Sequence, residues 1–224
     1  MDWSVRNLAS RCIKSLWPVM ILCLGACSTS SKLAALPYYQ GEDLTPVWLS
    51  SKALSAEPPQ QVGPFSLEDQ AKEKITEADL DGKIVVVNFF FTSCGGVCPT
   101  TMSHMKKIQT ALASDPRILL VSFSVDPETD TAEILSQYAK ERNISTVNWR
   151  LVTGSKAKIY EMARNSFFDD KDLGLDRTDD GFLHTETFYL LDGDRRIRGL
   201  YNGTQSREAL KILEDIRLLE KANG

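Results

Sequence analysis

Two cysteines four residues apart, Cys94 and Cys98, are the side chains of this sequence best suited to chemistry. Residues with this spacing on a helix lie on one side with Cβ atoms about 5–6 Å apart, so both sulfurs can reach one metal ion. If Gly95 and Gly96 loosen the first turn, the same pair can close to a disulfide. A helix N-terminus also favours the thiolate, which both metal binding and disulfide exchange require. The pair predicts a site that binds a metal, exchanges a disulfide, or does both.

The segments around the cysteines alternate between apolar β-branched runs and amphipathic stretches, which predicts one α/β domain. Residues 84–91 form a nearly continuous apolar run that leads directly into the cysteines, as a central strand covered on both faces should. Pro99 suits the first turn of a helix. Apolar residues follow at helical spacing, and we interpret them as core and not as a row of copper-binding methionines: Met102, Met105, Ile108 and Leu112. Further strands are predicted at 118–125, 149–152, 185–191 and 196–201, and helices at 132–143, 156–165 and 207–221.

A strand that runs into two cysteines at a helix start, then a later hairpin and a terminal helix, is the order of a thioredoxin-like domain. His184 directly precedes the first hairpin strand, and in such a domain that strand end lies beside the cysteine loop. Two thiolates and one imidazole make a soft three-ligand site that suits Cu(I) and accepts Cu(II). Zinc would normally need a fourth ligand, and no further Cys or well-placed His remains. The other histidine, His104, is assigned a surface or packing role.

The spacing of the cysteines departs from that of ordinary thioredoxin-type reductases. In those proteins we expect CxxC and a cis-proline before the facing strand, whereas this chain has CxxxC and no proline at residues 184–186. The departure favours metal handling over general thiol exchange.

The N-terminus has the layout of a signal peptide. Basic residues precede a short apolar run at 16–26, which ends in the sequence LGAC at Cys27. The run is too short for a membrane span, which needs about 20 residues. Because LGAC resembles a bacterial lipobox, we predict a lipoprotein signal peptide at 1–26, an acylated Cys27 with a flexible tether through 61, and the folded domain at 62–224. An ordinary signal peptide or a short anchor is the alternative.

This processing leaves Cys94 and Cys98 as the only free thiols, because Cys12 and Cys23 lie in the signal peptide and Cys27 carries the lipid. In an oxidising compartment such a pair either bonds to itself or holds a metal. The formal net charge of -4, from 26 basic and 30 acidic residues, provides no extended cationic surface, so nucleic acid is not expected as a partner.

Three segments together resemble the Sco/SenC family: residues 92–99 (TSCGGVCP), 124–131 (SVDPETDT) and 184–190 (HTETFYL). The resemblance covers about residue 62 to the C-terminus. It implies a thioredoxin-like fold, copper bound through Cys94, Cys98 and His184, and delivery of copper to the binuclear copper centre of cytochrome c oxidase. It also implies a companion role in keeping the cysteines of that centre reduced. The implied partners are the copper-bearing oxidase subunit or another copper client, and an upstream copper donor or thiol reductant.

Asp126 and Asp130 fall on a DxxxD motif of the same family. The resemblance makes them candidates for supporting the site without binding the metal, or for recognising a partner. The alternative is structural: Asp126-Pro127 ends a strand, and Asp130 caps the next helix.

Three functions compete for these residues. The leading hypothesis is a copper metallochaperone on the periplasmic side of a bacterial envelope, held to a membrane by lipid. The second is an enzyme, a thiol–disulfide oxidoreductase acting on extracytoplasmic cysteines. A peroxiredoxin-like peroxidase is a weaker third, because two cysteines so close together, with His184 nearby, suit chelation better than attack on peroxide.

Overall fold

Two strands that are buried along their whole length form the centre of the structure, a computed structural model that describes residues 36–41, 44–56, 58–113, 115–167 and 186–222. β5 (Ile84–Phe90) and β6 (Ile118–Ser124) pair in parallel, from Ile84 opposite Ile118 to Phe90 opposite Ser124. Strands covered on both faces are apolar throughout, which explains their sequences. The two predicted central strands are confirmed.

β5 and β6 belong to a seven-stranded mixed sheet with the order β4-β3-β7-β6-β5-β8-β9. The other strands are β3 (Ser66–Asp69), β4 (Lys74–Thr76), β7 (Trp149–Thr153), β8 (Thr187–Leu191) and β9 (Ile197–Asn202). β7 is parallel to β6, whereas the remaining pairs are antiparallel. β8 and β9 form the predicted hairpin.

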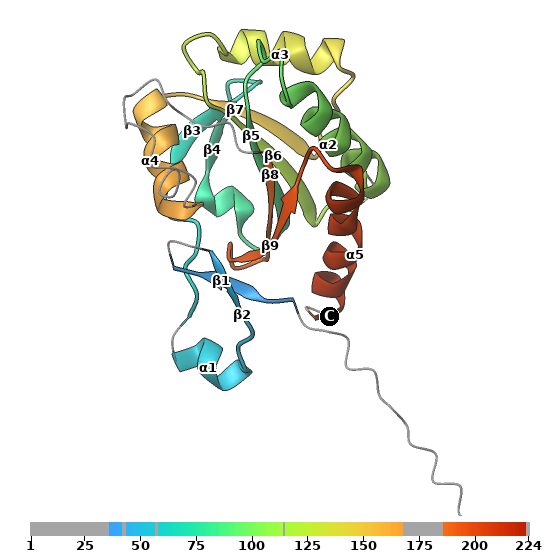
Figure 1. Ribbon diagram of the computed structural model, residues 1–224. Coiled ribbons are helices and arrows are strands. Elements are labelled where there is room, and N and C mark those ends of the chain that lie inside the picture. The colour runs from blue at the N-terminus through green and yellow to red at the C-terminus, as the bar shows by residue number, and fades with distance from the viewer. Residues whose placement is uncertain (1–35, 42–43, 57, 114, 168–185, 223–224) are drawn as a thin grey trace, which may run out of the picture. The chain divides into compact units, whose positions relative to one another are not determined.

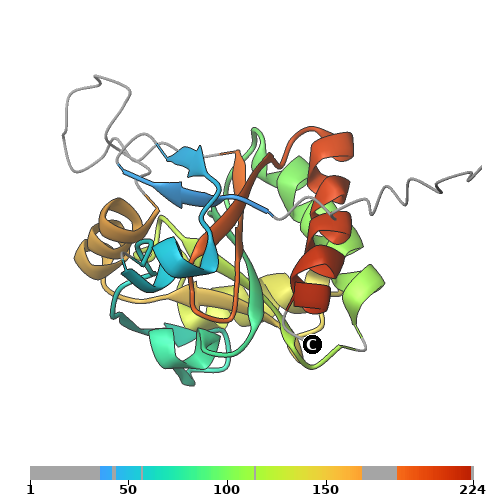
Figure 2. The ribbon, with the colours of Figure 1, turned by 90° about the horizontal axis from the view of Figure 1, so that it is seen from below.

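Helices cover both faces of this sheet (Figures 1 and 2). α2 (Cys98–Leu112), α3 (Ala132–Glu141) and α5 (Ser206–Ala222) contribute to a core cluster on one face, together with Val86 and Phe90 of β5. α4 (Lys156–Ser166) and a short 3-10 helix at Glu77–Leu80 contribute to the cluster on the other face, with Val85 and Phe89. The predicted α/β fold, a mixed sheet flanked by helices in thioredoxin-like order, is confirmed.

Two strands on one side of the sheet, β3 and the edge strand β4, were not predicted. Each is short, and buried residues alternate with exposed ones, so neither has the continuous apolar run that identifies the central strands. In the described part of the chain no helix is both long and apolar enough to span a bilayer. The apolar run at 16–26 lies outside the described residues.

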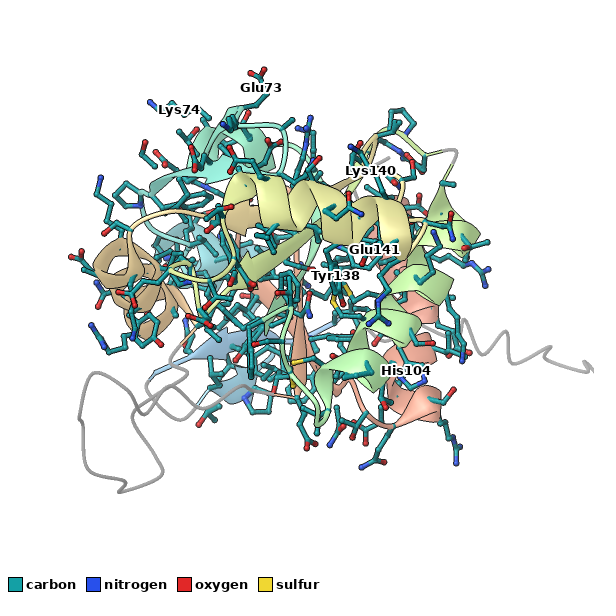
Figure 3. All side chains as sticks on the ribbon, turned by 90° about the horizontal axis from the view of Figure 1, so that it is seen from above. Glu73, Lys74, His104, Tyr138, Lys140 and Glu141 are labelled. Carbon is teal, nitrogen blue, oxygen red and sulfur yellow. The ribbon has the colours of Figure 1, made fainter. Side chains whose placement is uncertain are left out.

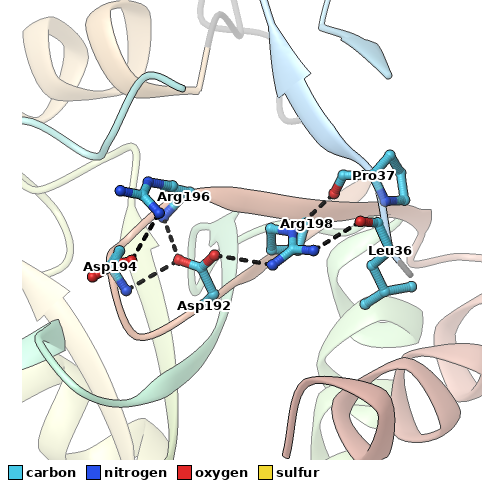
Figure 4. Close-up of polar contacts among 6 residues, drawn as sticks. All are labelled: Leu36, Pro37, Asp192, Asp194, Arg196 and Arg198. Atoms are coloured by element: carbon cyan, nitrogen blue, oxygen red, sulfur yellow. Dashed lines mark hydrogen bonds and ion pairs between the residues drawn. The ribbon is translucent and has the colours of Figure 1, made fainter. Parts of the chain in front are cut away.

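The described residues between 36 and 61 contain regular structure, whereas a flexible tether was predicted at 27–61. β1 (Tyr38–Gln40) pairs with β2 (Thr45–Val47), and α1 (Ser51–Ala56) follows. The guanidinium of Arg198 on β9 donates to the carbonyls of Leu36 and Pro37 at 2.7 and 2.9 Å (Figure 4) and stacks on the ring of Tyr38. One arginine thus holds three successive residues, 36–38, against β9.

Candidate metal and thiol site

The cysteine loop connects the end of β5 to the start of α2. Cys98 is the first residue of α2, Pro99 follows in the first turn, and Val97 is the N-cap. Cys94 lies in the loop before the helix, where its backbone N–H donates to the carbonyl of Phe91 at 3.3 Å. The expectation that both cysteines lie on one helical face is therefore wrong. The other expected arrangement, a first turn loosened at Gly95 and Gly96, agrees better with the structure. In it the two free thiols are within hydrogen-bonding reach of each other.

The two thiols have opposite electrostatic surroundings. Burial alone would raise the pKa of Cys94, but hydrogen bonds from the Cys98 side chain and from the backbone amides of Gly96, Val97 and Cys98 outweigh it and lower the pKa. Cys98 is only 3% exposed, and its burial, with the hydrogen bond and charge of Cys94, raises its pKa to about 12. Cys94, half-buried, is thus the more accessible and the more acidic of the two thiols, and Cys98 is the protonated partner.

A buried carboxylate holds the start of the cysteine loop. Asp130 is fully buried, and it accepts hydrogen bonds from the backbone N–H of Thr92 at 3.0 Å, from the Thr92 hydroxyl, and from the Ser124 hydroxyl at 2.6 Å. Thr92 lies two residues before Cys94, and Ser124 ends β6. Asp130 therefore ties the loop to the end of the neighbouring strand. It does not cap α3, because the N-cap is Thr131, whose side chain accepts from the N–H of Ile134.

Asp126, the other acidic residue of the motif, shapes the turn after β6. Its carbonyl accepts from the N–H groups of Thr129 and Asp130, and its own N–H donates to the Ser124 hydroxyl. The Asp126 side chain is half-buried, and among the described residues its carboxylate has no hydrogen-bond or ion-pair partner. A role of this carboxylate in partner recognition stays a prediction.

An apolar cluster lies behind Cys98. It includes Phe90, Met102 and Met105, which confirms that the methionine stripe of α2 is core. Tyr138 of α3 belongs to the same cluster and points from its helix toward the interior (Figure 3). Burial raises the pKa of Tyr138, Arg142 opposes this shift, and the negative charge of Asp130 adds to it. The tyrosine thus lies within electrostatic reach of the site.

The sequence did not single out Tyr138, Thr92 or Ser124. An aromatic residue on an amphipathic helix resembles any core residue, so nothing distinguishes Tyr138 in advance. Thr92 and Ser124 carried a usable signal, because both stand where neighbouring parallel strands end, and such ends meet at one edge of a sheet.

The third predicted ligand, His184, lies outside the described residues. The nearest described strand is β8, which pairs antiparallel with β5, Tyr189 opposite Val87 and Leu191 opposite Val85. This register directs the start of β8 to the sheet edge at which β5 ends and the cysteine loop begins. Within the described residues, no group of three or more His, Cys, Asp or Glu side chains is arranged to hold a metal ion.

His104, the other histidine, is buried in the structure. Its ring Nδ1 lies 2.7 Å from the carbonyl oxygen of Gly203, after β9. Since a carbonyl can only accept, Nδ1 carries the proton and donates. Of the two roles assigned to this residue, surface or packing, the surface role is wrong.

Comparison with known proteins gives consistent matches. A model of the SCO1/SenC family matches residues 54–219. The chain is 32% identical over 161 residues to the SCO1 protein homolog of Bacillus subtilis, a match that covers 70% of this chain and 81% of that relative. The solved structure of BsSco, described as a member of the Sco family of cytochrome c oxidase assembly proteins with a disulfide switch, is 29% identical with a TM-score of 0.59, covering 71% and 92% of the two chains. Bradyrhizobium japonicum ScoI, solved with copper bound, is 25% identical with a TM-score of 0.55, covering 69% and 99%.

We predict that Asp130→Ala destabilises the protein by at least about 3 kcal/mol, because the Thr92 N–H and two hydroxyls lose a buried acceptor at once. Asp130→Asn, which keeps one carbonyl oxygen, should lose less. The measurement is the free energy of unfolding in urea. The matched control is Asp126→Ala, which removes a carboxylate without partners and should change stability by no more than about 0.5 kcal/mol. Equal losses in Asp126→Ala and Asp130→Ala would contradict the assignment.

Proposed function

Because the chain belongs to the SCO1/SenC family, we propose that it is an extracytoplasmic protein that binds copper through Cys94, Cys98 and His184 and delivers it to the binuclear copper centre of cytochrome c oxidase. The observation that carries the proposal is the pair of free, adjacent thiols in the loop that leads into α2. Thiolates are soft ligands and select Cu(I). The copper-bound relative and the relative described as an oxidase assembly protein support the same function.

The loop also provides a route for handing copper to a client. Cys94 is the more exposed thiol, and both neighbouring glycines are exposed. A Cβ at Gly95 would meet no atom within 4 Å, and one at Gly96 would meet only the Cys94 sulfur, at 4.0 Å. The backbone of another protein can therefore come close to Cys94. A client thiolate then displaces this outer ligand first, and the copper ion, as cargo, passes on without a change of charge.

We predict that the reduced protein binds one copper ion and that Cys94→Ser, Cys98→Ser and His184→Ala each weaken Cu(I) or Cu(II) binding at least tenfold, as loss of a ligand should. Competition with a chromogenic copper chelator gives the affinities. Ser103→Ala, an exposed change on α2, is the matched control and should bind as the parent does. Unchanged binding in all three ligand variants would refute the proposed site.

The opposite pKa shifts of the two thiols favour a second function, thiol–disulfide exchange. The Cys94 thiolate attacks a client disulfide and one client sulfur leaves as a thiol. Cys98, after losing its proton, then attacks Cys94, releases the second client thiol and leaves Cys94–Cys98 oxidised. An upstream thiol reductant must restore the dithiol. The disulfide switch described for BsSco supports this chemistry.

We predict that Cys98→Ser, whose hydroxyl keeps the hydrogen bond to Cys94, forms a stable mixed disulfide with an aromatic disulfide reagent. Because the Cys94 pKa is lowered, the reaction should persist at pH values where an ordinary cysteine, with a pKa of about 8.5, is mostly protonated. Cys94→Ser should react slowly at neutral pH, since Cys98 is buried and burial, the largest cause of its raised pKa, remains in this variant. Equal rates for the two variants would contradict this order of attack.

His184→Ala separates the two functions, because it should lose copper binding and keep thiol exchange.

The lipid anchor is a further part of the proposal, supported by the basic residues, the apolar run and the LGAC sequence. We predict that Cys27→Ser releases the protein from the membrane fraction and abolishes labelling with radioactive fatty acid. Cys23→Ser, inside the same apolar run, is the control and should stay membrane-bound. Retention of Cys27→Ser in the membrane would favour an uncleaved anchor.

A further inference from the structure

The side chain of His104 connects α2 to the turn after β9. α2 begins at Cys98, so His104 belongs to the helix that carries one of the proposed copper ligands (Figure 3). Its Nδ1–H donates to the Gly203 carbonyl at 2.7 Å, and the ring is only 6% exposed. A buried hydrogen bond of this length fixes the turn against the helix.

Gly203 in turn holds the residue that precedes β8. Its N–H donates to the carbonyl of Glu186 at 2.6 Å. A Cβ at Gly203 would lie 2.6 Å from the ring of Phe188 and 2.8 Å from the Glu186 carbonyl, so only glycine allows this approach. One residue after β9, Gly203, is thus bonded to Glu186 through its N–H and to His104 through its carbonyl.

The side chain of Glu186 is held in the same place. Its carboxylate accepts from the Asn202 amide at 3.2 Å. The Thr204 hydroxyl lies between two acceptors, the Asn202 side-chain oxygen at 2.6 Å and the Glu186 carboxylate at 3.3 Å, and its one proton is shared between them. Backbone and side chain of Glu186 are therefore both anchored to the turn at 202–204, and that turn is anchored to α2 by His104.

We propose that His104 is a positioning residue for the copper site: through Gly203 and Glu186 it fixes the entry to β8 relative to the helix that begins at Cys98. This inference rests on the proposed function, in which His184, two residues before Glu186, is the third ligand. The cysteine ligands and the histidine ligand come from chain segments far apart in sequence. The His104–Gly203–Glu186 contacts, which we call the α2–β8 clamp, join α2, which begins at Cys98, to the start of β8, which follows His184.

The test is a double-mutant cycle on copper affinity. His104→Leu removes the donor and should weaken Cu(II) binding about tenfold, the lower end of the effect expected when support for a ligand is lost. In a His184→Ala background the same change should have no further effect, because a ligand that is absent cannot be positioned. His104→Asn, whose amide nitrogen takes the place of Nδ1, should restore binding, whereas His104→Gln, one carbon longer, should not.

A second readout needs no copper. Hydrogen exchange of the Gly203 amide should become faster in His104→Leu and His104→Gln and stay slow in His104→Asn, since only the last keeps the clamp. The matched control is Gln109→Leu. Gln109 is also a buried α2 side chain that donates to a loop carbonyl, that of Ser145 at 2.6 Å, but it lies at the other end of the helix. It should lower stability without changing copper affinity or Gly203 exchange.

The outcomes separate the two proposals. If His184→Ala binds copper as the parent does, the three-ligand site is wrong, and the positioning role falls with it. If His184→Ala weakens binding but His104→Leu does not, or if His104→Leu weakens it equally in both backgrounds, only the positioning role is overturned. If His104→Leu does not fold, Thr204→Val, which loosens Glu186 from the other side, should give a smaller weakening that is likewise absent in the His184→Ala background; no weakening there would also overturn the role.

Discussion

The buried carboxylate of Asp130 is the interaction on which the geometry of the cysteine site depends. Parallel pairing brings β5 and β6 to an end together, and the last backbone bond between them runs from the Val125 N–H to the Phe90 carbonyl at 2.9 Å. Beyond this bond the two chains are joined by the Asp130 carboxylate, which accepts hydrogen bonds from Thr92 after β5 and from Ser124 at the end of β6. A carboxylate that accepts several hydrogen bonds can be buried without a cation. Asp130 therefore fixes the start of the loop at Thr92 and leaves the residues after it free to adopt a different conformation.

This anchoring explains why the two cysteines differ. A helix N-terminus should favour thiolate at both, yet the two neighbouring sulfurs differ in burial and in hydrogen-bond partners. Cys98 points into the apolar cluster with Phe90, and the desolvation there outweighs the helix. Cys94 remains in the loop, where the amides of Gly96 and Val97 donate to its sulfur. The start of the helix therefore stabilises negative charge on Cys94, in the preceding loop, and not on Cys98, its own first residue.

The parts of the fold that could be predicted from sequence are those in which a local pattern has one explanation. The apolar runs of β5 and β6 permit only central strands, and an amphipathic stretch such as Ala132–Glu141 permits only a surface helix. Contacts between distant segments leave no such pattern. Nothing near residues 36–38 indicates that Arg198 holds them, and nothing near His104 indicates Gly203. The cysteines could be identified from type and spacing, but which of them is the more acidic depends on burial that no spacing encodes.

A protein that carries copper must hold its ligands in place and still release the ion, and the described parts of the site divide these tasks between different residues. Asp130 fixes the chain before Cys94, the first turn of α2 fixes Cys98, and the clamp through His104 fixes the entry to β8. Between the two cysteines, Gly95 and Gly96 leave open space on the outer side. Binding that is preorganised on three sides lowers the entropic cost of capturing copper. In the proposed transfer a client enters on the fourth side, at Cys94, so retention and release are controlled at separate places around the site.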